Sequence, residues 1–367
     1  MLDHSYFSEQ IIPIADKVLK GERVGQEDCL TLYRQASLPE LGVLANAVRE
    51  RWNGKKVFFN RNFHIEPTNI CVNKCKFCSY RREEGQTGSW DLSLDEIFTI
   101  AQHYVNKDIT EVHVVGGVHP RHAFDYYEKM IGGLHELLPQ AHIKAFTAEE
   151  LWKMAELRGT PVADVLYRLQ ELGLGSIPGG GAEILDDSVR AVICAQKISS
   201  QIWLNVHEQV HSLGMPSNAT MLYGHVETFE HRVKHLSQLR DLQDITKGFN
   251  AFIPLKYRSA NNELGAAGEL AVMEDLRNLA ICRIFLENVP HIKAYWPMLG
   301  KSVSQLALAF GADDLDGTID DSTKIYSMAG AHDKNPAMSV AELANICRSA
   351  GFTPVERDSL YREIKQY

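Results

Sequence analysis

Eight short apolar segments, separated by helix-length intervals over about 250 residues, constrain the fold of this 367-residue chain most strongly. Short apolar runs that alternate with helical periodicity are typical of parallel βα units. Eight such units close into a barrel, so the sequence predicts an α/β fold, a TIM-type (β/α)8 barrel. The predicted strands are Phe63–Pro67, Glu111–Val115, His142–Phe146, Leu174–Ile177, Asn218–Leu222, Phe249–Ile253, His291–Tyr295 and Ala312–Leu315.

The regions on either side of these segments define the expected domain organisation. Residues 1–56 carry apolar residues at helical spacing, so we expect a helical N-terminal extension. Residues 57–350 are predicted to form the barrel, and the charged residues 351–367 a C-terminal tail packed on it. Capping boxes that begin at Ser93 and Thr147 mark the first residues of two barrel helices.

The composition narrows the class of protein. Hydrophobic residues make up 45% of the chain and charged residues 23%, which allows a large core and excludes global disorder. The net charge of -9 and the lack of a long basic run argue against nucleic acid or an anionic membrane as a partner. No apolar run approaches roughly 18 residues, and the beginning of the chain is charged throughout, so we expect neither a membrane span nor a secretory signal. The odd number of cysteines, seven, indicates reduced thiols in the cytoplasm.

Three cysteines lie within eight residues, in the segment E-P-T-N-I-C-V-N-K-C-K-F-C-S-Y at 66–80. Thiolates select zinc, copper(I) or iron–sulfur clusters. A structural zinc site needs four ligands, so Cys71, Cys75 and Cys78 would leave one position open unless a residue such as His64 completed a zinc knuckle. The other cysteines are solitary and are predicted to be small buried apolar residues: Cys29, Cys194, Cys282 and Cys347.

The spacing C-x-x-x-C-x-x-C, with an aromatic residue before the last cysteine, resembles the signature of the radical S-adenosylmethionine (SAM) superfamily. In that superfamily three cysteines hold a [4Fe–4S] cluster, and the fourth iron binds the amino and carboxylate groups of SAM. The resemblance implies that Cys71, Cys75 and Cys78 are the cluster ligands. Phe77 and Tyr80 flank the last cysteine and are candidates to contact adenine, although ordinary packing explains them equally well.

Two glycine-rich loops follow predicted strands, where barrel enzymes place their active sites. Gly116 and Gly117 resemble the family's Gly-Gly loop, which bonds the methionine amino group of SAM, although such a pair alone is often only a turn. The fourth strand ends in I-P-G-G-G-A-E, and Glu183 could accept hydrogen bonds from a ribose diol. The alternative role of Glu183 is a solvated carboxylate at a helix start.

Further polar residues are candidates to contact a substrate. H-I-K-A-F at 142 recurs as H-I-K-A-Y at 291, and alternation along a strand places Lys144 and Lys293 inside the barrel. These two strands could equally be similar by chance. His225 follows the fifth strand and Arg258 the sixth, and an arginine binds a planar carboxylate bidentately. Surface or structural roles are the alternative for each residue.

A zinc-protease motif, H-E-x-x-H, occurs at His207, Glu208 and His211. Its segment is predicted to be the helix before the fifth strand, outside the barrel and away from the mouth. The third histidine of one protease class would fall at 217, where serine stands, whereas Glu227 or Glu230 could be the third ligand of another. The sequence favours a polar outer helix face over a zinc site.

A wider resemblance covers nearly the whole chain and narrows the superfamily to the aminofutalosine synthases. Thr246-Lys-Gly departs slightly from that family, in which a second glycine is expected before the sixth strand. The phrases that resemble the family are H-I-E-P-T-N-I-C-V at 64, G-S-W at 88, G-G-V-H-P at 116, H-I-K-A-F-T-A at 142, P-G-G-G-A-E at 178, T-M-L-Y-G-H-V-E at 220, F-I-P-L at 252 and H-I-K-A-Y-W-P-M at 291.

The resemblance implies a reaction and its partners. The 5′-deoxyadenosyl radical from SAM adds to 3-[(1-carboxyvinyl)oxy]benzoate, giving 6-amino-6-deoxyfutalosine, methionine and bicarbonate in menaquinone biosynthesis. A donor such as flavodoxin or ferredoxin would reduce the cluster. Alternatives are cyclic dehypoxanthinyl futalosine synthase, a deazaflavin synthase subunit, an H-E-x-x-H zinc hydrolase and a non-catalytic iron–sulfur electron carrier.

Overall fold

Eight parallel strands form a barrel in the computed structural model, which describes residues 4–265, 269–319, 324–331 and 336–367. The strands pair in the orders β2-β3-β4-β5 and β6-β7-β8, and single parallel bridges join β5 to β6 and β8 to β9. All eight predicted strands are confirmed. Their bounds are β2 Asn62–Ile65, β3 Glu111–Val114, β4 His142–Ala145, β5 Leu174–Ser176, β6 Ser217–Tyr223, β7 Phe249–Lys256, β8 His291–Ile292 and β9 Asp314–Gly317.

A bent first strand closes the barrel. β1 (Lys56–Asn60) pairs in parallel with β9, and after Arg61 the chain continues as β2, which pairs with β3. Across the closure, the Asn62 amide donates to Thr318 Oγ1 at 3.1 Å, and that hydroxyl donates to the Asn62 carbonyl at 2.9 Å. A Cβ at Gly317 would lie 2.2 Å from Asn60 Oδ1. Only glycine lets the two strands approach this closely.

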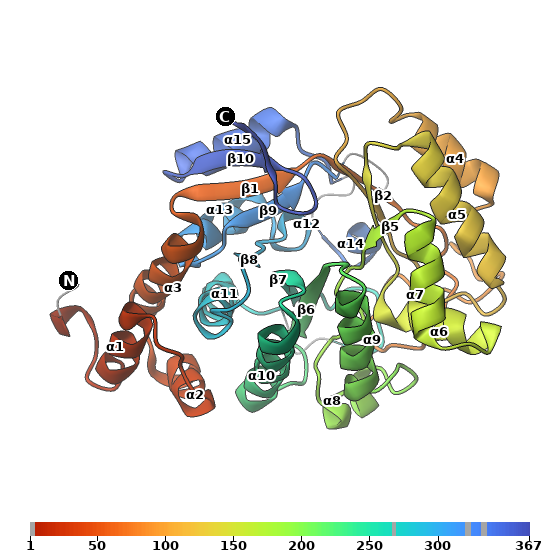
Figure 1. Ribbon diagram of the computed structural model, residues 1–367. Helices are drawn as coiled ribbons and strands as arrows, with labels where there is room; N and C mark the ends of the chain where they lie inside the picture. The colour runs from red at the N-terminus through yellow and green to blue at the C-terminus, as the bar shows by residue number, and fades with distance from the viewer. Residues whose placement is uncertain (1–3, 266–268, 320–323, 332–335) are drawn as a thin grey trace.

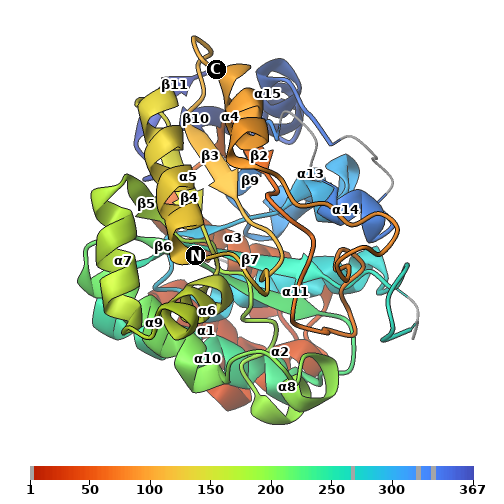
Figure 2. The same ribbon diagram turned by 90° about the vertical axis from the view of Figure 1, so that its right-hand side faces the viewer.

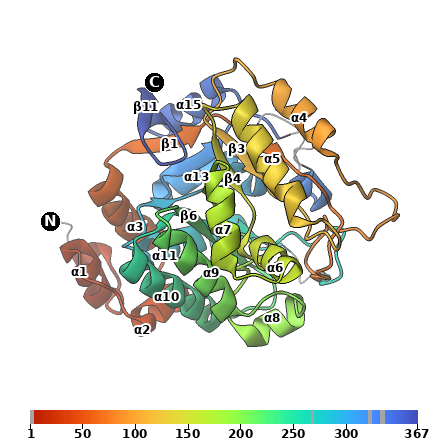
Figure 3. The same ribbon diagram turned by 45° about the vertical axis from the view of Figure 1, so that its right-hand side comes forward.

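Helices surround the strands, as Figure 1 shows. α5, α7 and α9 lie side by side along one flank in Figure 3 and contact one another in order. Both predicted capping boxes are present, at Ser93 and Thr147. The helices after β2 are α4 Leu94–Gln102, α5 Phe124–Leu137, α6 Ala148–Arg158, α7 Val162–Glu171, α8 Asp187–Ile193, α9 Ser200–Ser212, α10 Phe229–Thr246, α11 Val272–Phe285, α12 Trp296–Leu299, α13 Lys301–Ala307, α14 Ile325–Met328 and α15 Val340–Ser349, with a 3-10 turn at Leu308–Phe310.

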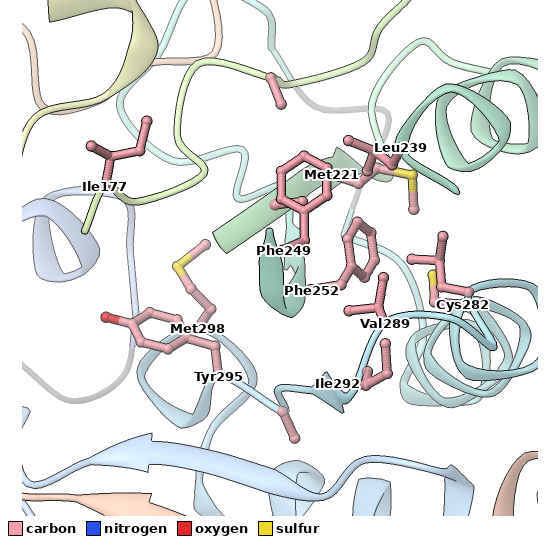
Figure 4. Close-up of a cluster of buried hydrophobic side chains, with 14 of the residues drawn as sticks. Ile177, Met221, Leu239, Phe249, Phe252, Cys282, Val289, Ile292, Tyr295 and Met298 are labelled. Atoms are coloured by element: carbon pink, nitrogen blue, oxygen red, sulfur yellow. The ribbon is translucent and has the colours of Figure 1, made fainter. Parts of the chain in front are cut away.

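The apolar core lies between the strands and these helices. Figure 4 shows Phe249 and Phe252 of β7 packed among Leu239, Val289 and Cys282. The four solitary cysteines, including Cys282, are all buried as predicted. Within the described ranges, no helix has the length and apolar character needed to span a membrane.

The N-terminal extension is helical, as the sequence predicts. It consists of a 3-10 turn at His4–Tyr6 and the helices α1 (Ile12–Lys20), α2 (Gln26–Gln35) and α3 (Leu38–Asn53). Figure 1 shows these helices beside α10 and α11. The Tyr33 ring stacks on that of Phe229 with centroids 4.7 Å apart, and its hydroxyl donates to Asn278 Oδ1 at 2.7 Å.

The C-terminal tail contains two strands that the sequence did not predict. β10 (Thr353–Arg357) pairs in parallel with β1, and β11 (Glu363–Gln366) pairs antiparallel with β10, beside the C-terminus in Figure 2. The turn between them fills the N-terminal end of the barrel. Its Ser359 hydroxyl donates to Glu111 Oε2 at 2.7 Å, and its Tyr361 ring stacks on His291 at 3.6 Å.

One buried ion pair fixes this tail to the barrel. Arg357 Nε donates to Asp314 Oδ2 at 2.7 Å, and neither residue is more than 1% exposed. Removing one partner of a buried ion pair leaves the other charge desolvated and unpaired, which costs about 3–5 kcal/mol.

We therefore expect Arg357→Leu to lower the free energy of unfolding by about 3–5 kcal/mol in anaerobic urea denaturation. The control is Arg362→Leu, because the Arg362 side chain is 76% exposed and lies 3.8 Å from Asp358. An exposed pair contributes at most about 1 kcal/mol. Equal losses in the two variants would show that the buried pair does not stabilise the tail.

Candidate functional site

A cavity of about 300 Å³ lies at the C-terminal ends of the barrel strands. This is the end at which barrel enzymes place their active sites. Ten of the twelve residues predicted to bind the cluster, SAM or substrate line it, whereas His225 and Lys293 do not. The ten are Cys71, Cys75, Phe77, Cys78, Tyr80, Gly116, Gly117, Lys144, Glu183 and Arg258.

Two of the sequence phrases brace the segment that carries the cysteines. Asn69 Nδ2 donates to the Gly88 carbonyl at 2.9 Å, and the Trp90 amide donates to Asn69 Oδ1 at 2.9 Å. Trp90 Nε1 donates to the Glu66 carbonyl at 3.0 Å. The E-P-T-N and G-S-W phrases are therefore partners that hold the two ends of the cysteine segment together.

The three thiols are not gathered as closely as the ligands of a single zinc ion would be. Three thiolates on one tetrahedral zinc, with bonds of about 2.3 Å, would lie about 3.8 Å apart. In the described part of the chain, the Sγ atoms of Cys71, Cys75 and Cys78 do not form a set within 4.8 Å of one another. The expected knuckle ligand, His64, instead stacks on His113 inside the barrel.

The environment of the thiols needs a cationic group to hold them ionised. Burial raises the pKa of both Cys71 and Cys75, because a desolvated thiolate is unfavourable. The Val118 amide donates to Cys71 Sγ at 3.3 Å, which partly opposes this effect. Lys197 also opposes the effect of burial on both thiols but does not outweigh it. A metal cluster would supply the further positive charge.

The Gly-Gly loop requires glycine at both positions because its backbone contacts the backbone of the cysteine segment. A Cβ at Gly116 would lie 2.8 Å from the Thr68 carbonyl oxygen, and one at Gly117 only 2.4 Å from that of Ile70. The Gly117 amide donates to the Thr68 carbonyl at 2.7 Å. Substitution of either glycine would therefore push the cysteine segment away from β3.

The triple-glycine loop is held by side chains from three elements. Thr220 Oγ1 donates to the Gly179 carbonyl at 2.6 Å, and Trp203 Nε1 donates to that of Gly180 at 3.1 Å. Arg190 Nη1 donates to the carbonyl of Gly181 at 3.1 Å. These three hydrogen bonds anchor the loop to β6, α9 and α8.

Glu183 follows this loop and lines the cavity. There it pairs with a lysine from another loop, which the sequence analysis did not identify. Glu183 has φ +46°, and its carboxylate accepts from Lys197 Nζ at 2.6 Å. Burial opposes the Lys197 charge, but Glu183 and the nearby thiols outweigh it and raise the pKa of Lys197 well above its usual value. Lys197 stands in a loop before α9, where no sequence motif marks it.

Comparisons with known proteins identify the family. The radical SAM superfamily model matches residues 65–239, and the CofH/MqnC C-terminal region model matches residues 246–366. The chain is 43% identical to the aminodeoxyfutalosine synthase of Thermus thermophilus, over 97% of this chain and 96% of the relative. The chain belongs to the aminodeoxyfutalosine synthase family of radical SAM enzymes. It therefore catalyses a radical SAM reaction of the futalosine pathway to menaquinone, with a [4Fe–4S] cluster and SAM as cofactors.

Other members of the superfamily are also similar to this chain. The cyclic dehypoxanthine futalosine synthase of Streptomyces coelicolor is 37% identical over 96% of this chain and 88% of the relative. The crystal structure of methylornithine synthase (PylB) superposes with a TM-score of 0.74 at 16% identity, covering 93% of this chain and 97% of that one. At that identity, the second likeness shows the fold alone.

The two similar strands of this radical SAM enzyme point their lysines into the barrel, as the alternation predicts. Lys144 Nζ donates to Glu111 Oε1, and Lys293 Nζ donates to Asp316 Oδ1, each at 2.6 Å. Lys144 borders the cavity and Lys293 does not.

The two loop candidates are both held by neighbouring groups. His225 lies outside the cavity lining, with Nε2 3.0 Å from the Leu222 carbonyl and Nδ1 3.2 Å from the Glu227 carboxylate. Arg258 lines the cavity, where it bonds Glu269 at 2.7 Å and the Met298 carbonyl. Its buried Nε has no hydrogen-bond partner within the described ranges.

The H-E-x-x-H motif lies on α9, outside the barrel. His207 Nδ1 and His211 Nε2 each lie 2.8 Å from the same Ser217 hydroxyl, and Glu208 is exposed. The two imidazoles share one hydroxyl on the inner side of α9, where His207 is fully buried. The predicted polar outer face is therefore wrong for the histidines and holds only for Glu208. The candidate third ligands are engaged elsewhere, Glu227 with Arg232 at 2.6 Å and Glu230 with Arg34.

A second group resembles a metal site that the sequence did not suggest: Asp91, His119 and His122. The amides of Arg121 and His122 both donate to His119 Nδ1, at 3.2 and 3.1 Å. The neutral His119 ring must then carry its proton on Nε2, the atom that faces Asp91. A protonated nitrogen cannot bind a metal, so this group is a hydrogen-bonded contact between two loops.

Glu150, beside the Gly-Gly loop, provides a pH test of this region. Its carboxylate accepts from the Thr147 amide at 2.7 Å, and burial raises its pKa to about 7. A carboxyl whose pKa is raised on folding stabilises the fold at low pH and loses that contribution as pH rises through the folded value.

The free energy of unfolding of Glu150→Gln minus that of the parent should rise by about 1.5 kcal/mol as pH rises from 6 to 8.5. The reason is that glutamate loses its proton in this range at a cost to the fold, whereas glutamine cannot ionise. Thermal unfolding at several pH values measures this difference. Glu96→Gln is the control, since Glu96 occupies the same capping-box position but is exposed, with a lowered pKa. A stability difference independent of pH in the first variant would contradict the assignment.

Proposed function

We propose that this radical SAM enzyme is a transferase that adds the 5′-deoxyadenosyl group of SAM to 3-[(1-carboxyvinyl)oxy]benzoate. When bound, the reduced cluster supplies the electron that splits SAM into methionine and the 5′-deoxyadenosyl radical. Addition to the vinyl carbon and rearrangement would be followed by loss of the carboxylate, which takes up water to become bicarbonate, and by return of the electron to the cluster, leaving 6-amino-6-deoxyfutalosine. The observation that carries this proposal is that three cysteines, an apolar wall and buried cations line one cavity.

Cys71, Cys75 and Cys78 would hold the cluster, which leaves one iron without a protein ligand. The Gly116 and Gly117 carbonyls are suited to accept from the SAM ammonium group, because an ammonium only donates. Glu183 would accept from the ribose hydroxyls while Lys197 fixes its position.

Phe77 and Tyr80 would flank the adenine. The Phe77 ring lies 5.7 Å from Lys197 Nζ, at the same end of the cavity as Glu183. The Tyr80 hydroxyl donates to the Thr68 carbonyl at 3.3 Å, and its ring packs edge-on against Trp90. Tyr80 therefore presents a ring that is already fixed.

The opposite wall suits an aromatic substrate with two carboxylates. Apolar side chains from β6, β7 and α12 line it, and Figure 4 shows Tyr295 and Met298 side by side. Arg258 and Lys144 add cationic groups within reach of this wall. Radical addition needs little acid–base catalysis, and a mostly apolar lining would protect the radical from side reactions. The other apolar residues of the wall are Leu222, Ile253 and Leu255.

The electron donor would approach the outer face of the cysteine segment. Lys74 and Lys76 are exposed there, between the predicted cluster ligands. Two exposed cations favour a donor with an acidic surface, such as flavodoxin or ferredoxin.

The test is the set of nucleoside products from reconstituted enzyme, SAM, reductant and the vinyl ether. We expect one 6-amino-6-deoxyfutalosine for each methionine released, because the adenosyl group is incorporated and not recycled. Mass spectrometry and chromatography measure both products. Free 5′-deoxyadenosine as the sole nucleoside would mean hydrogen abstraction, as in a related radical SAM enzyme, and would contradict addition.

Single cysteine variants provide the controls for this test. Cys71→Ala, Cys75→Ala and Cys78→Ala should each abolish cluster absorbance and product formation. Cys282→Ala should keep both, because Cys282 belongs to α11 and is fully buried in the core. A fully loaded cluster in any of the first three variants would overturn the ligand assignment.

A further inference from the structure

A row of three polar side chains crosses the floor of the cavity. His64 on β2 pairs in register with His113 on β3, which pairs in register with Lys144 on β4. All three line the cavity. The two imidazole rings are stacked, with centroids 4.7 Å apart and an interplanar angle of 25°. Neither histidine has a role in holding the cluster or SAM in the proposed function.

The His64 ring has a hydrogen-bonding group that the protein does not satisfy. The residue is only 4% exposed, and its Nε2 atom has no partner in the described part of the chain. A buried polar group without a partner costs about 1–3 kcal/mol. The cost is recovered if a ligand supplies the missing partner.

The charges near the floor are matched in pairs before a ligand enters. Glu111 pairs with Lys144, and Asp316 pairs with Lys293 and also accepts from Asn62 Nδ2 at 3.1 Å. Burial lowers the pKa of His64 to about 4 and that of His113 well below its usual value, so both rings are neutral. A neutral imidazole offers one N–H donor and can still accept a proton.

These observations point to an anionic ligand with strong acceptor atoms. A carboxylate would satisfy the imidazole N–H groups, and the nearby Lys144 ammonium would favour it electrostatically. On the basis of the proposed function, we propose that His64 and His113 together bind a carboxylate of the aromatic substrate. The pair would therefore determine specificity for an acid over its neutral analogue.

Binding of a carboxylate at the histidine pair should be accompanied by uptake of protons from the solvent. The charged groups that face the pair are Glu111 of β3, Lys144 of β4, Lys293 directly after β8, and Asp316 of β9, and their charges cancel. An added negative charge nearby raises a pKa by about one to three units. The His64 pKa would then rise from about 4 towards neutrality, and affinity would increase as pH falls from 8 to 6.

The experiment measures binding without turnover. Reconstituted enzyme with SAM and no reductant is titrated calorimetrically with 3-[(1-carboxyvinyl)oxy]benzoate and two analogues. One analogue has an amide in place of the ring carboxylate, and the other lacks the enol-ether carboxylate. Titration of the parent acid in two buffers of different ionisation enthalpy counts the protons taken up.

We expect the double variant His64→Leu/His113→Leu to lose at least tenfold in the ratio of affinities for the acid and one of its analogues. The analogue concerned identifies which carboxylate the pair binds. His64→Gln/His113→Gln should fold with polar side chains retained and should take up no proton on binding. His207→Leu is the control, because His207 is also a buried histidine but lies outside the barrel, so its loss should leave both readouts unchanged.

Unchanged affinity ratios in the leucine double variant would overturn the proposal. Proton uptake that persists in the glutamine double variant would assign the proton to another group and would also overturn it. Conversion of the vinyl ether by the parent enzyme separates the two hypotheses. If the parent forms no adenosylated product, the proposed function fails; if it does and the ratios are unchanged, only the role of the histidine pair fails.

Discussion

The backbone contact between the Gly-Gly loop and the cysteine segment is the constraint on which the site depends. Gly116 and Gly117 press against the carbonyls of residues 68–70, closer than any side chain would allow. The Gly-Gly loop, which follows β3, therefore fixes the position of the cysteine segment relative to the barrel. The thiols of Cys71, Cys75 and Cys78 then stand at the mouth, on the same cavity as Glu183 and Lys197. Close packing between two loops thus positions the residues that are proposed to hold the cofactors.

A second constraint acts from the other end of the barrel. The tail turn holds one oxygen of Glu111 through Ser359, and Lys144 holds the other. Polar side chains therefore connect the N-terminal end of the barrel, which the tail turn fills, to the cavity floor. Each charged group in this connection has a partner of opposite charge or a hydrogen-bond donor. A floor of this kind can accept a substrate carboxylate only if it gains a donor or a proton, which is the function proposed for His64 and His113.

The sequence predicted the parts of the fold that rest on local patterns. Eight apolar runs gave the strands, the capping boxes at Ser93 and Thr147 gave two helix starts, and alternation gave the inward direction of Lys144 and Lys293. The tail strands were missed because T-P-V-E-R and E-I-K-Q lack an apolar pattern. Their stability comes from pairing with β1 and from the Arg357–Asp314 pair, partners 43 residues apart that no local pattern connects.

For the site, too, the sequence predicted only the residues that a local pattern or motif marks. The motif residues Cys71, Gly116 and Glu183 could be found because spacing and family likeness mark them. Lys197 and the His64–His113 pair could not, because their importance arises from strand register and from side chains that meet in space. His225 shows the reverse case, in which a plausible loop histidine turns away to Glu227 and Leu222.

In the proposed function, one iron of the cluster has no protein ligand and binds SAM. Cys194 is the residue to test as a possible fourth ligand. Burial raises the pKa of Cys75 most, and Cys194 lies near enough to add to that effect. The most direct measurement is Mössbauer spectroscopy of 57Fe-reconstituted enzyme with and without SAM, repeated on Cys194→Ala. We expect SAM to change the signal of one iron in four, identically in both proteins. A cluster whose signal does not respond to SAM, or that responds only in the variant, would contradict it.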